Sequence, residues 1–302
     1  MKDLCVDAAR IPLAVGGSST RGADYLALTK PRLNFLVVLT TAAGYFLGAP
    51  GSVDFLAMAS AVVGTALVAG GAAVLNQVYE RDTDALMRRA RMRPLPDGRV
   101  APTDATLFGI ALTGCGLMLL AARANLWAAL LALATVVIYL IVYTPMKRTS
   151  SLSTLVGAVP GALPPLIGWV ASHGAISTGG GSLFAIVFLW QIPHFMAIAW
   201  LYRDDYRKAG FPMLPVVEPD GRRTGRQAVL YAAALLPMSL APTLFGVSGR
   251  SYFGIALVLG GALLWLAVRF AAARSETAAR RLFFGSIIYL PLLWLAMIAN
   301  HF

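Results

Sequence analysis

The run D-F-L-A-M-A-S-A-V-V-G-T-A-L-V-A-G-G-A-A-V-L (residues 54–75) leads directly into N-Q-V-Y-E-R-D-T-D-A-L-M-R-R-A-R-M-R-P-L-P (residues 76–96). An apolar segment of this length, rising about 1.5 Å per residue as a helix, crosses the ~30 Å of hydrocarbon in a bilayer. The stretch that follows packs three carboxylates and five arginines into a short space. Together the two stretches predict a transmembrane helix that ends in a dense group of charges.

Three polar side chains in the charged stretch are spaced four residues apart: Asn76, Glu80 and Asp84. On a helix, four residues turn the chain by about 400°, so these side chains stack on one face, whereas Asp82 points about 200° away from Glu80. An amide and two carboxylates followed by cations suit a divalent metal bridged to a phosphate. The alternative is a charge cluster beside the membrane that only fixes orientation.

The composition is that of a membrane protein. Of 302 residues, 58% are hydrophobic and 13% charged, and the mean hydropathy is +0.71; soluble domains carry about 25% charged residues. The net charge of +11 fits the excess of cations on cytoplasmic loops, so we expect no nucleic-acid partner. Cys5 and Cys115 are isolated and form neither a disulfide framework nor a metal knuckle.

Apolar segments long enough to span a bilayer predict an all-α bundle of nine transmembrane helices, because only helices and closed barrels cross lipid. They lie at about residues 33–49, 54–75, 105–122, 126–143, 154–172, 182–201, 228–247, 252–270 and 282–300. The predicted organisation is a polar cytoplasmic N-terminal tail (1–29) followed by one nine-helix intramembrane domain (30–302). The tail contains acids and lacks the long apolar core of a signal peptide, which favours a bacterial inner membrane over a mitochondrial one.

The distribution of cations predicts the orientation. With nine spans, every Lys and Arg except Arg123 and Arg250 falls in the tail or in the loops after the second, fourth, sixth and eighth spans. Lysine and arginine concentrate on the cytoplasmic side of membrane proteins. We therefore expect the N-terminus and these loops in the cytoplasm and the C-terminus outside.

A second charged stretch, Y-R-D-D-Y-R-K-A-G-F-P-M-L-P (residues 202–215), leaves the sixth span on the same side as the first. Acids from both stretches facing one pocket would hold Mg²⁺, which takes few protein ligands and bridges to substrate phosphates. Lys147 and Arg148 end the fourth span on that side and would complete a phosphate clamp. Alternatively, the second stretch only caps its helix and reaches to the interface.

His194, in W-Q-I-P-H-F (190–195), is an ionisable residue deep within a predicted span. Such a residue is a functional candidate, as a metal ligand, a haem contact or a base; the alternative is a neutral histidine bonded to a neighbouring helix. The preceding span carries Gly157, Gly161 and Gly168 among three prolines. That pattern is typical of close helix packing and is compatible with a cavity wall.

These motifs resemble a known family. N-Q-V-Y-E-R-D-T-D followed by R-A-R-M-R-P-L-P is similar to the first aspartate-rich motif of the intramembrane (UbiA-type) prenyltransferases, the superfamily of 4-hydroxybenzoate polyprenyltransferase. Within it, the chain looks like the protohaem IX farnesyltransferases, or haem O synthases. The closer resemblance lies in K-P-R (30–32), Y-T-P-M-K-R (143–148), G-A-V-P-G-A-L-P-P-L-I-G-W (157–169), W-Q-I-P-H-F (190–195) and D-Y-R-K-A-G-F-P-M-L-P (205–215).

The resemblance implies farnesyl transfer from farnesyl diphosphate to a vinyl group of haem B, with addition of water, giving haem O and diphosphate. It implies a helical bundle around a lipid-open cavity with Mg²⁺ at its cytoplasmic mouth. Besides membrane lipid, it suggests downstream partners, namely haem A synthase or terminal-oxidase assembly proteins. A relative that prenylates a quinone or chlorophyll precursor remains an alternative, and a transporter is a more distant one.

The resemblance also assigns residues. Asn76, Glu80 and Asp84 match the superfamily pattern N-x-x-x-D-x-x-x-D and, with Asp205, are the expected catalytic and Mg²⁺–diphosphate residues. The usual second acid four residues after Asp205 is replaced by Ala209, which leaves open how many metals bind. The candidate diphosphate contacts are Arg88, Arg93, Lys147, Arg148 and Arg203. His194 is the candidate haem contact.

Overall fold

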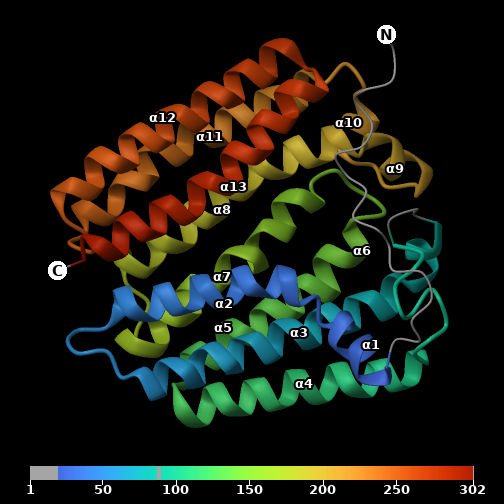
Figure 1. Ribbon diagram of the computed structural model, residues 1–302, viewed down its shortest axis with the longest axis horizontal. Helices are drawn as coiled ribbons and strands as arrows, with labels where there is room; N and C mark the ends of the chain where they lie inside the picture. Colours follow the sequence, from blue (N-terminus) through green and yellow to red (C-terminus); the bar gives the residue numbers. More distant parts are fainter. Residues whose placement is uncertain (1–19, 87–89, 302) are drawn as a thin grey trace.

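The computed structural model of the chain describes residues 20–86 and 90–301, and every regular element among them is a helix (Figure 1). The helices are α1 (Arg21–Leu28), α2 (Pro31–Gly48), α3 (Phe55–Leu86), α4 (Pro102–Arg123), α5 (Leu126–Val137), the π-helical turn η1 (Ile138–Tyr143), α6 (Thr144–Met146), α7 (Ser153–His173), α8 (Thr178–Leu201), α9 (Arg203–Lys208), α10 (Leu214–Val217), α11 (Arg222–Leu244), α12 (Arg250–Ala273) and α13 (Glu276–Ala299). The predicted all-α class is confirmed.

Eight long helical segments in the described ranges are apolar enough to cross a membrane, with α5, η1 and α6 counting as one continuous span. The first predicted span corresponds to α2, which has 18 residues and carries Arg32 and Asn34 in its first turn. Helix α2 is not among those eight segments. The chain is a multi-pass membrane protein, and nine as the number of spans stays a prediction.

The long helices extend further than the apolar runs that predict them. Helix α3 does not stop at Leu75 but continues through the charged stretch to Leu86. The chain contains neither glycine nor proline between Gly71 and Pro94, so nothing in the sequence interrupts the helical hydrogen bonds. Its 32 residues measure about 48 Å against ~30 Å of hydrocarbon, so the charged end projects past the apolar layer.

The helices form two groups. Helices α2, α3, α4, α5 and α7 lie together, α8, α11, α12 and α13 form the second group, and α7 packs against α8 where the groups join (Figure 1). Most of the buried apolar side chains belong to one core that runs through both groups. The short helices α6, α9 and α10 lie at one end of the bundle.

Small residues bring α2 and α7 into close contact. A side chain at Gly44 would overlap the backbone of Pro165, and one at Gly168 would overlap the backbone of Thr41. Helix α7 remains helical through Pro160, Pro164 and Pro165. The close-packing interpretation of this glycine-rich segment is therefore confirmed.

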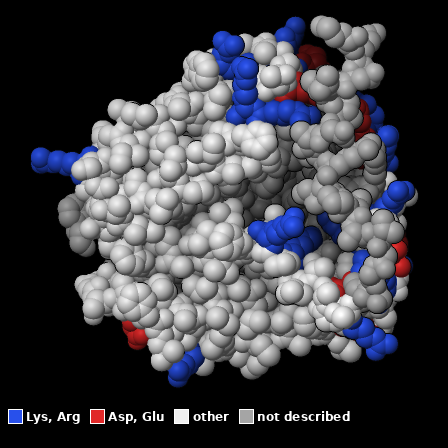
Figure 2. Space-filling view, viewed as in Figure 1, with Lys and Arg blue, Asp and Glu red and all other residues white. Residues whose placement is uncertain are grey.

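The two charged stretches meet at the same end of the bundle. Ala90, after α3, and Phe211, after α9, are both fully buried in one small apolar cluster. Figure 2 shows lysines and arginines gathered at this end, with one group in the middle of the face beside a hollow. Part of the predicted tail is ordered as α1, which Gln77 of α3 anchors by donating from Nε2 to the Leu28 carbonyl at 2.6 Å.

Candidate active site

The polar stripe on α3 has the predicted arrangement. Asn76, Glu80 and Asp84 are only 2%, 4% and 1% exposed, so all three face the protein interior. The Asp82 side chain is 84% exposed and pairs with its neighbour Arg81. The four-residue spacing thus separates a buried stripe from an exposed acid on the same helix.

Each buried carboxylate meets a cation from another segment. Lys147, just after α6, donates to both oxygens of Glu80, at 2.9 and 3.1 Å. Arg93, after α3, donates from Nη1 to Oδ2 of Asp84 at 2.6 Å. Burying a carboxylate without a partner is strongly unfavourable, so these cations make the interior position of both acids tenable.

Asn76 is held by the span opposite it. Its Nδ2 donates to Thr144 Oγ1 at 3.1 Å, and its Oδ1 accepts from the Tyr139 hydroxyl at 3.2 Å. Thr144 in turn donates to the Tyr139 carbonyl at 2.7 Å. The π-helical turn between these two residues lets both reach the same amide of α3.

Lys30 belongs to this site, although the K-P-R motif (30–32) contributed only to the family resemblance and Lys30 was not predicted as a site residue. It precedes Pro31, the first residue of α2, and has a left-handed backbone with φ of 51°. The turn is secured by Asn34, whose Nδ2 donates to the Thr29 carbonyl at 2.6 Å. Burial lowers the pKa of Lys30 to about 8, the charges of Arg93 and Lys147 lower it as well, and Glu80 and Asp84 oppose this shift.

Lys30 therefore lies within electrostatic reach of both carboxylates and both of their cations. The signal that would have found it is the K-P-R motif, in which a cation stands at a proline-fixed helix start on the charged side. Two carboxylates and three cations leave the site with a net positive charge, which suits an anionic ligand.

The other predicted residues are placed differently. Arg148 reaches α3 on its exposed side, where it bonds Thr83 Oγ1 and lies over the Tyr79 ring. Arg203 turns toward α13: it donates to the Trp200 carbonyl at 2.8 Å and pairs with Glu276 at 3.7 Å. Arg88 lies outside the described residues.

Asp205 is half-exposed on α9 and has no side-chain partner among the described residues. It is linked to the α3 site indirectly. Tyr206, its neighbour, packs edge-on against Phe211 with 6.3 Å between ring centroids, and Lys147 Nζ lies 5.2 Å from the centre of the Phe211 ring. The structure thus brings the two stretches into contact without bringing Asp205 to Glu80 or Asp84.

The donor set fits a metal that is shared with a phosphate. In the described ranges, no three histidine, cysteine, aspartate or glutamate side chains converge closely enough to enclose an ion. Mg²⁺ commonly binds through one or two carboxylates, with phosphate oxygens and water completing its octahedron. Glu80 and Asp84, with hard oxygen donors one helical turn apart, meet that requirement.

His194 lies in a separate place, between α8 and α13. Its ring stacks between Trp190 and Phe283, with centroids 5.1 Å away on each side. Its Nδ1 lies 2.8 Å from Ser286 Oγ. The alternative prediction for His194 was a neutral histidine bonded to a neighbouring helix, and the contact with Ser286 of α13 is such a bond. This bond uses Nδ1 and leaves Nε2 for another contact.

Comparison with known proteins identifies the family. Residues 37–290 match the model of the UbiA prenyltransferase family. The chain belongs to this family. A Solibacter usitatus protein named protoheme IX farnesyltransferase is 46% identical over 287 residues, covering 92% of this chain and 98% of that protein. A Koribacter versatilis protein of the same name is 44% identical, covering 96% and 97%.

Solved structures share the UbiA-family fold. A digeranylgeranylglyceryl phosphate synthase superposes with a TM-score of 0.79 at 17% identity, covering 92% of this chain and 97% of that one. A UbiA homologue from Archaeoglobus fulgidus bound to DMAPP and Mg²⁺ superposes with a TM-score of 0.65 at 18% identity, covering 91% and 99%. The two-group helical bundle is therefore the fold of the UbiA family.

Proposed function

We propose that this UbiA-family protein transfers the farnesyl group of farnesyl diphosphate to a vinyl group of haem B (protohaem IX), with addition of water to the same vinyl group, giving haem O and diphosphate. The names of relatives that match nearly the whole chain at 46% and 44% identity support this assignment. We place the protein in a bacterial inner membrane, with the charged end in the cytoplasm and the C-terminus outside. Haem A synthase or terminal-oxidase assembly proteins are the partners that would receive the product.

One structural observation supports the reaction type: Glu80 and Asp84 are buried on one helix face, and each is held by a cation. When bound, Mg²⁺ neutralises part of the charge that develops on the leaving diphosphate. Glu80, Asp84 and Asn76 would hold the metal–diphosphate unit from α3, with Asp205 of α9 as the remaining candidate ligand.

The cations then stabilise the leaving group. Lys30, Arg93 and Lys147 surround the carboxylates and would donate to diphosphate oxygens. Arg88, Arg148 and Arg203 remain further candidates for diphosphate contact. In a low-dielectric site such contacts are much stronger than in water. The stacked rings of Tyr139 and Tyr143, 5.5 Å apart beside Asn76 and Lys147, offer π faces to the allylic cation that forms.

We place haem near His194. Ser286 donates its only hydroxyl proton to the Phe283 carbonyl at 2.6 Å, so toward His194 its oxygen acts as the acceptor. Nδ1 of His194 then carries the proton, and Nε2 keeps a lone pair for the haem iron or a haem substituent. The flanking rings of Trp190 and Phe283 keep the imidazole in this orientation.

The test is an assay with competing acceptors. Purified protein in liposomes is incubated with farnesyl diphosphate, Mg²⁺ and haem B, and haem O is detected by mass. A parallel sample contains a 4-hydroxybenzoate or chlorophyll-precursor acceptor instead. We expect haem O in the first sample alone. Prenylated product only in the second sample would overturn the assignment of the acceptor.

Removal of the metal tests the second part of the proposal. Chelation should stop turnover and added Mg²⁺ should restore it. Turnover that survives exhaustive chelation would refute the metal role while leaving the haem assignment intact.

A further inference from the structure

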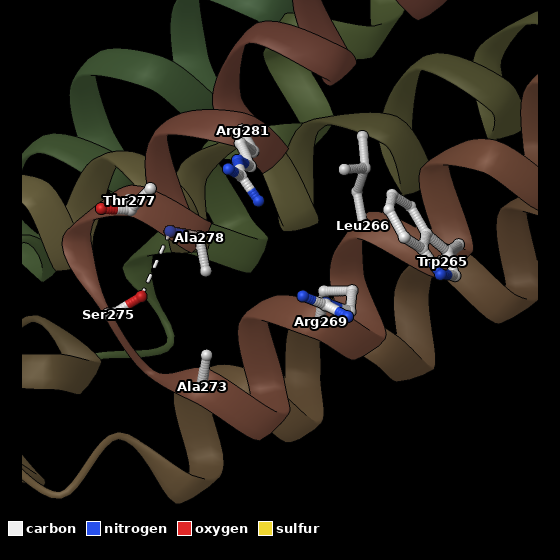
Figure 3. A pocket seen from close by; sticks show the side chains of 8 residues that line it. All are labelled: Trp265, Leu266, Arg269, Ala273, Ser275, Thr277, Ala278 and Arg281. Atoms are coloured by element: carbon white, nitrogen blue, oxygen red, sulfur yellow. Dashed lines mark hydrogen bonds between the residues drawn. The ribbon is translucent and has the colours of Figure 1, made fainter.

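A pocket outside the candidate active site lies between the end of α12 and the beginning of α13 (Figure 3). Its volume is about 120 Å³, whereas sites for whole cofactors or drug-sized ligands occupy roughly 300 Å³ or more. The pocket therefore admits one small group, such as a phosphate, and neither a haem nor a farnesyl chain. It shares no residue with the α3 site or with the surroundings of His194.

Two arginines point into this pocket from different helices, Arg269 from α12 and Arg281 from α13 (Figure 3). In the described part of the chain, neither guanidinium pairs with a carboxylate; Arg269 lies over the Trp265 ring, 5.6 Å from its centroid. Glu276, the acid between them in sequence, pairs with Arg203. The pocket thus concentrates positive charge for which residues 20–86 and 90–301 supply no carboxylate partner.

Hydroxyl groups add further donors. Ser275 and Thr277 line the same pocket, and Ser275 Oγ accepts from the Ala278 amide at 3.3 Å, which leaves its own proton to donate (Figure 3). Guanidinium groups bind phosphate with paired donors in a fixed geometry. Two such groups with two hydroxyls form a site for an anion with several oxygens.

The position of the pocket indicates where the anion comes from. Arg203–Glu276, together with edge-on packing of Trp200 and Phe270 at 6.0 Å, places the α12–α13 turn at the charged end of the bundle. Both helices are apolar enough to span a membrane, and Trp265, Val268 and Phe284 beside the pocket are exposed. In a bilayer that surface faces acyl chains, and tryptophan favours the headgroup level.

The helices close above the pocket. A side chain at Gly285, one turn after Arg281, would overlap Leu266, so α12 and α13 are in contact there. The pocket is therefore bounded on one side by the contact between α12 and α13 and on the other by the turn that joins them. Basic pockets between membrane helices at this depth are typical of anionic-lipid binding.

We propose that the pocket between α12 and α13 binds the phosphate of an anionic membrane lipid through Arg269 and Arg281. Ser275 and Thr277 donate to the remaining oxygens, and the acyl chains lie along Trp265 and the exposed apolar face of α12 and α13. This site is independent of the prenyl-transfer reaction.

The experiment measures lipid retention. The full-length protein is purified from vesicles of equal phosphatidylglycerol and phosphatidylcholine, and the retained lipid is quantified by native mass spectrometry. We expect the wild type to retain phosphatidylglycerol preferentially. Arg269→Gln and Arg281→Gln should each weaken that preference about fivefold, and together about 30-fold.

The matched control removes the same charge from the same turn outside the pocket. Arg274→Gln with Arg280→Gln should leave the preference within about twofold of wild type. Equal losses in the two double variants, equal retention of both lipids by the wild type, or complete displacement of the lipid by excess inorganic phosphate would each overturn the proposal. Both pocket arginines are exposed, so the single variants provide the test even if the double variant is poorly expressed.

Discussion

The end of α3 and the short helix α9 carry the same kinds of residue, acids followed by bases, at the same end of the bundle. In α3, Glu80 and Asp84 are buried, and each meets a cation from a distant segment. In α9, Asp204 is exposed and pairs with Arg207 only three residues on, and Asp205 is half-exposed. Composition alone does not distinguish the two stretches.

Helix length explains the difference. Helix α3 has 32 residues and α9 has six. A long helix keeps side chains four apart on one face over many turns and can press that face against neighbouring spans. A helix of less than two turns has room for local pairs only. The comparison indicates that α3 supplies buried carboxylates and that the carboxylates of α9 are more exposed.

The largest effect should come from Asp84. Asp84→Asn keeps the shape but removes the buried charge that faces Arg93, so we expect kcat/KM for farnesyl diphosphate to fall about 1000-fold. Steady-state assays with haem O as product measure this, and size-exclusion behaviour checks that the variant is folded. Asp82→Asn is the control, with activity close to wild type because its side chain is exposed. A similar loss in both variants would contradict the division of α3 into two faces.

The next largest effect should distinguish two adjacent cations, Lys147 and Arg148. Lys147→Gln should lower kcat/KM about 100-fold, because it removes a donor to the diphosphate and leaves Glu80 buried without its cation. The thermal midpoint of unfolding should fall as well. Arg148→Gln removes an exposed charge on the other side of α3 and should cost no more than about threefold. A larger loss of kcat/KM in Arg148→Gln than in Lys147→Gln would contradict the proposal that diphosphate binds on the face of α3 that carries Glu80.

The α9 carboxylates should matter less than those of α3. Asp205→Asn should lower kcat/KM about tenfold and raise the Mg²⁺ concentration needed for half-maximal rate, since Asp205 is a proposed metal ligand that lies outside the buried α3 stripe. Asp204→Asn, which breaks an exposed local pair, should change neither value. A loss of kcat/KM in Asp205→Asn as large as that in Asp84→Asn would contradict the distinction between the buried carboxylates of α3 and the more exposed carboxylates of α9.

The smallest effect is a pH dependence. The pKa of Lys30 is lowered to about 8, so its positive charge is lost as the pH rises through that value. Diphosphate binding favours the protonated amine, and kcat/KM, which reports the free enzyme, should therefore fall several-fold between about pH 8 and pH 9. Lys30→Arg stays protonated and should abolish this decline. If kcat/KM declined over the same pH range in Lys30→Arg, the decline would be caused by the titration of another group.

Local patterns predicted the α3 site, and long-range contacts account for what they missed. The stripe of Asn76, Glu80 and Asp84 depends only on helical spacing, so it was visible in the sequence. The end of α3 was not visible in the sequence, because an apolar run indicates only the part of a helix that lies in the hydrocarbon layer. Helix α3 continues beyond that part to Leu86. Lys30 enters the site from the start of α2, the helix before α3, through a turn that Asn34 secures.

The same reason explains the positions of Arg203 and His194. Arg203 follows α8 as predicted. Its guanidinium lies over the Trp200 ring and pairs with Glu276, so it faces α13. His194 is bonded to Ser286 of α13, which lies 92 residues later in the chain. Contacts of this kind follow from packing between the two helix groups, which no spacing rule encodes.

The ion pairs Lys147–Glu80 and Arg93–Asp84 also affect the order in which ligands bind. A lone Mg²⁺ at the proposed site would displace both cations and leave them without their carboxylate partners. A metal that arrives with diphosphate gives each displaced cation a new anion at the same moment. Metal and prenyl diphosphate then bind cooperatively, each raising the affinity of the other by the same factor. Titration with Mg²⁺ alone would release little heat, and the same titration with a non-hydrolysable farnesyl diphosphate analogue would show saturable binding.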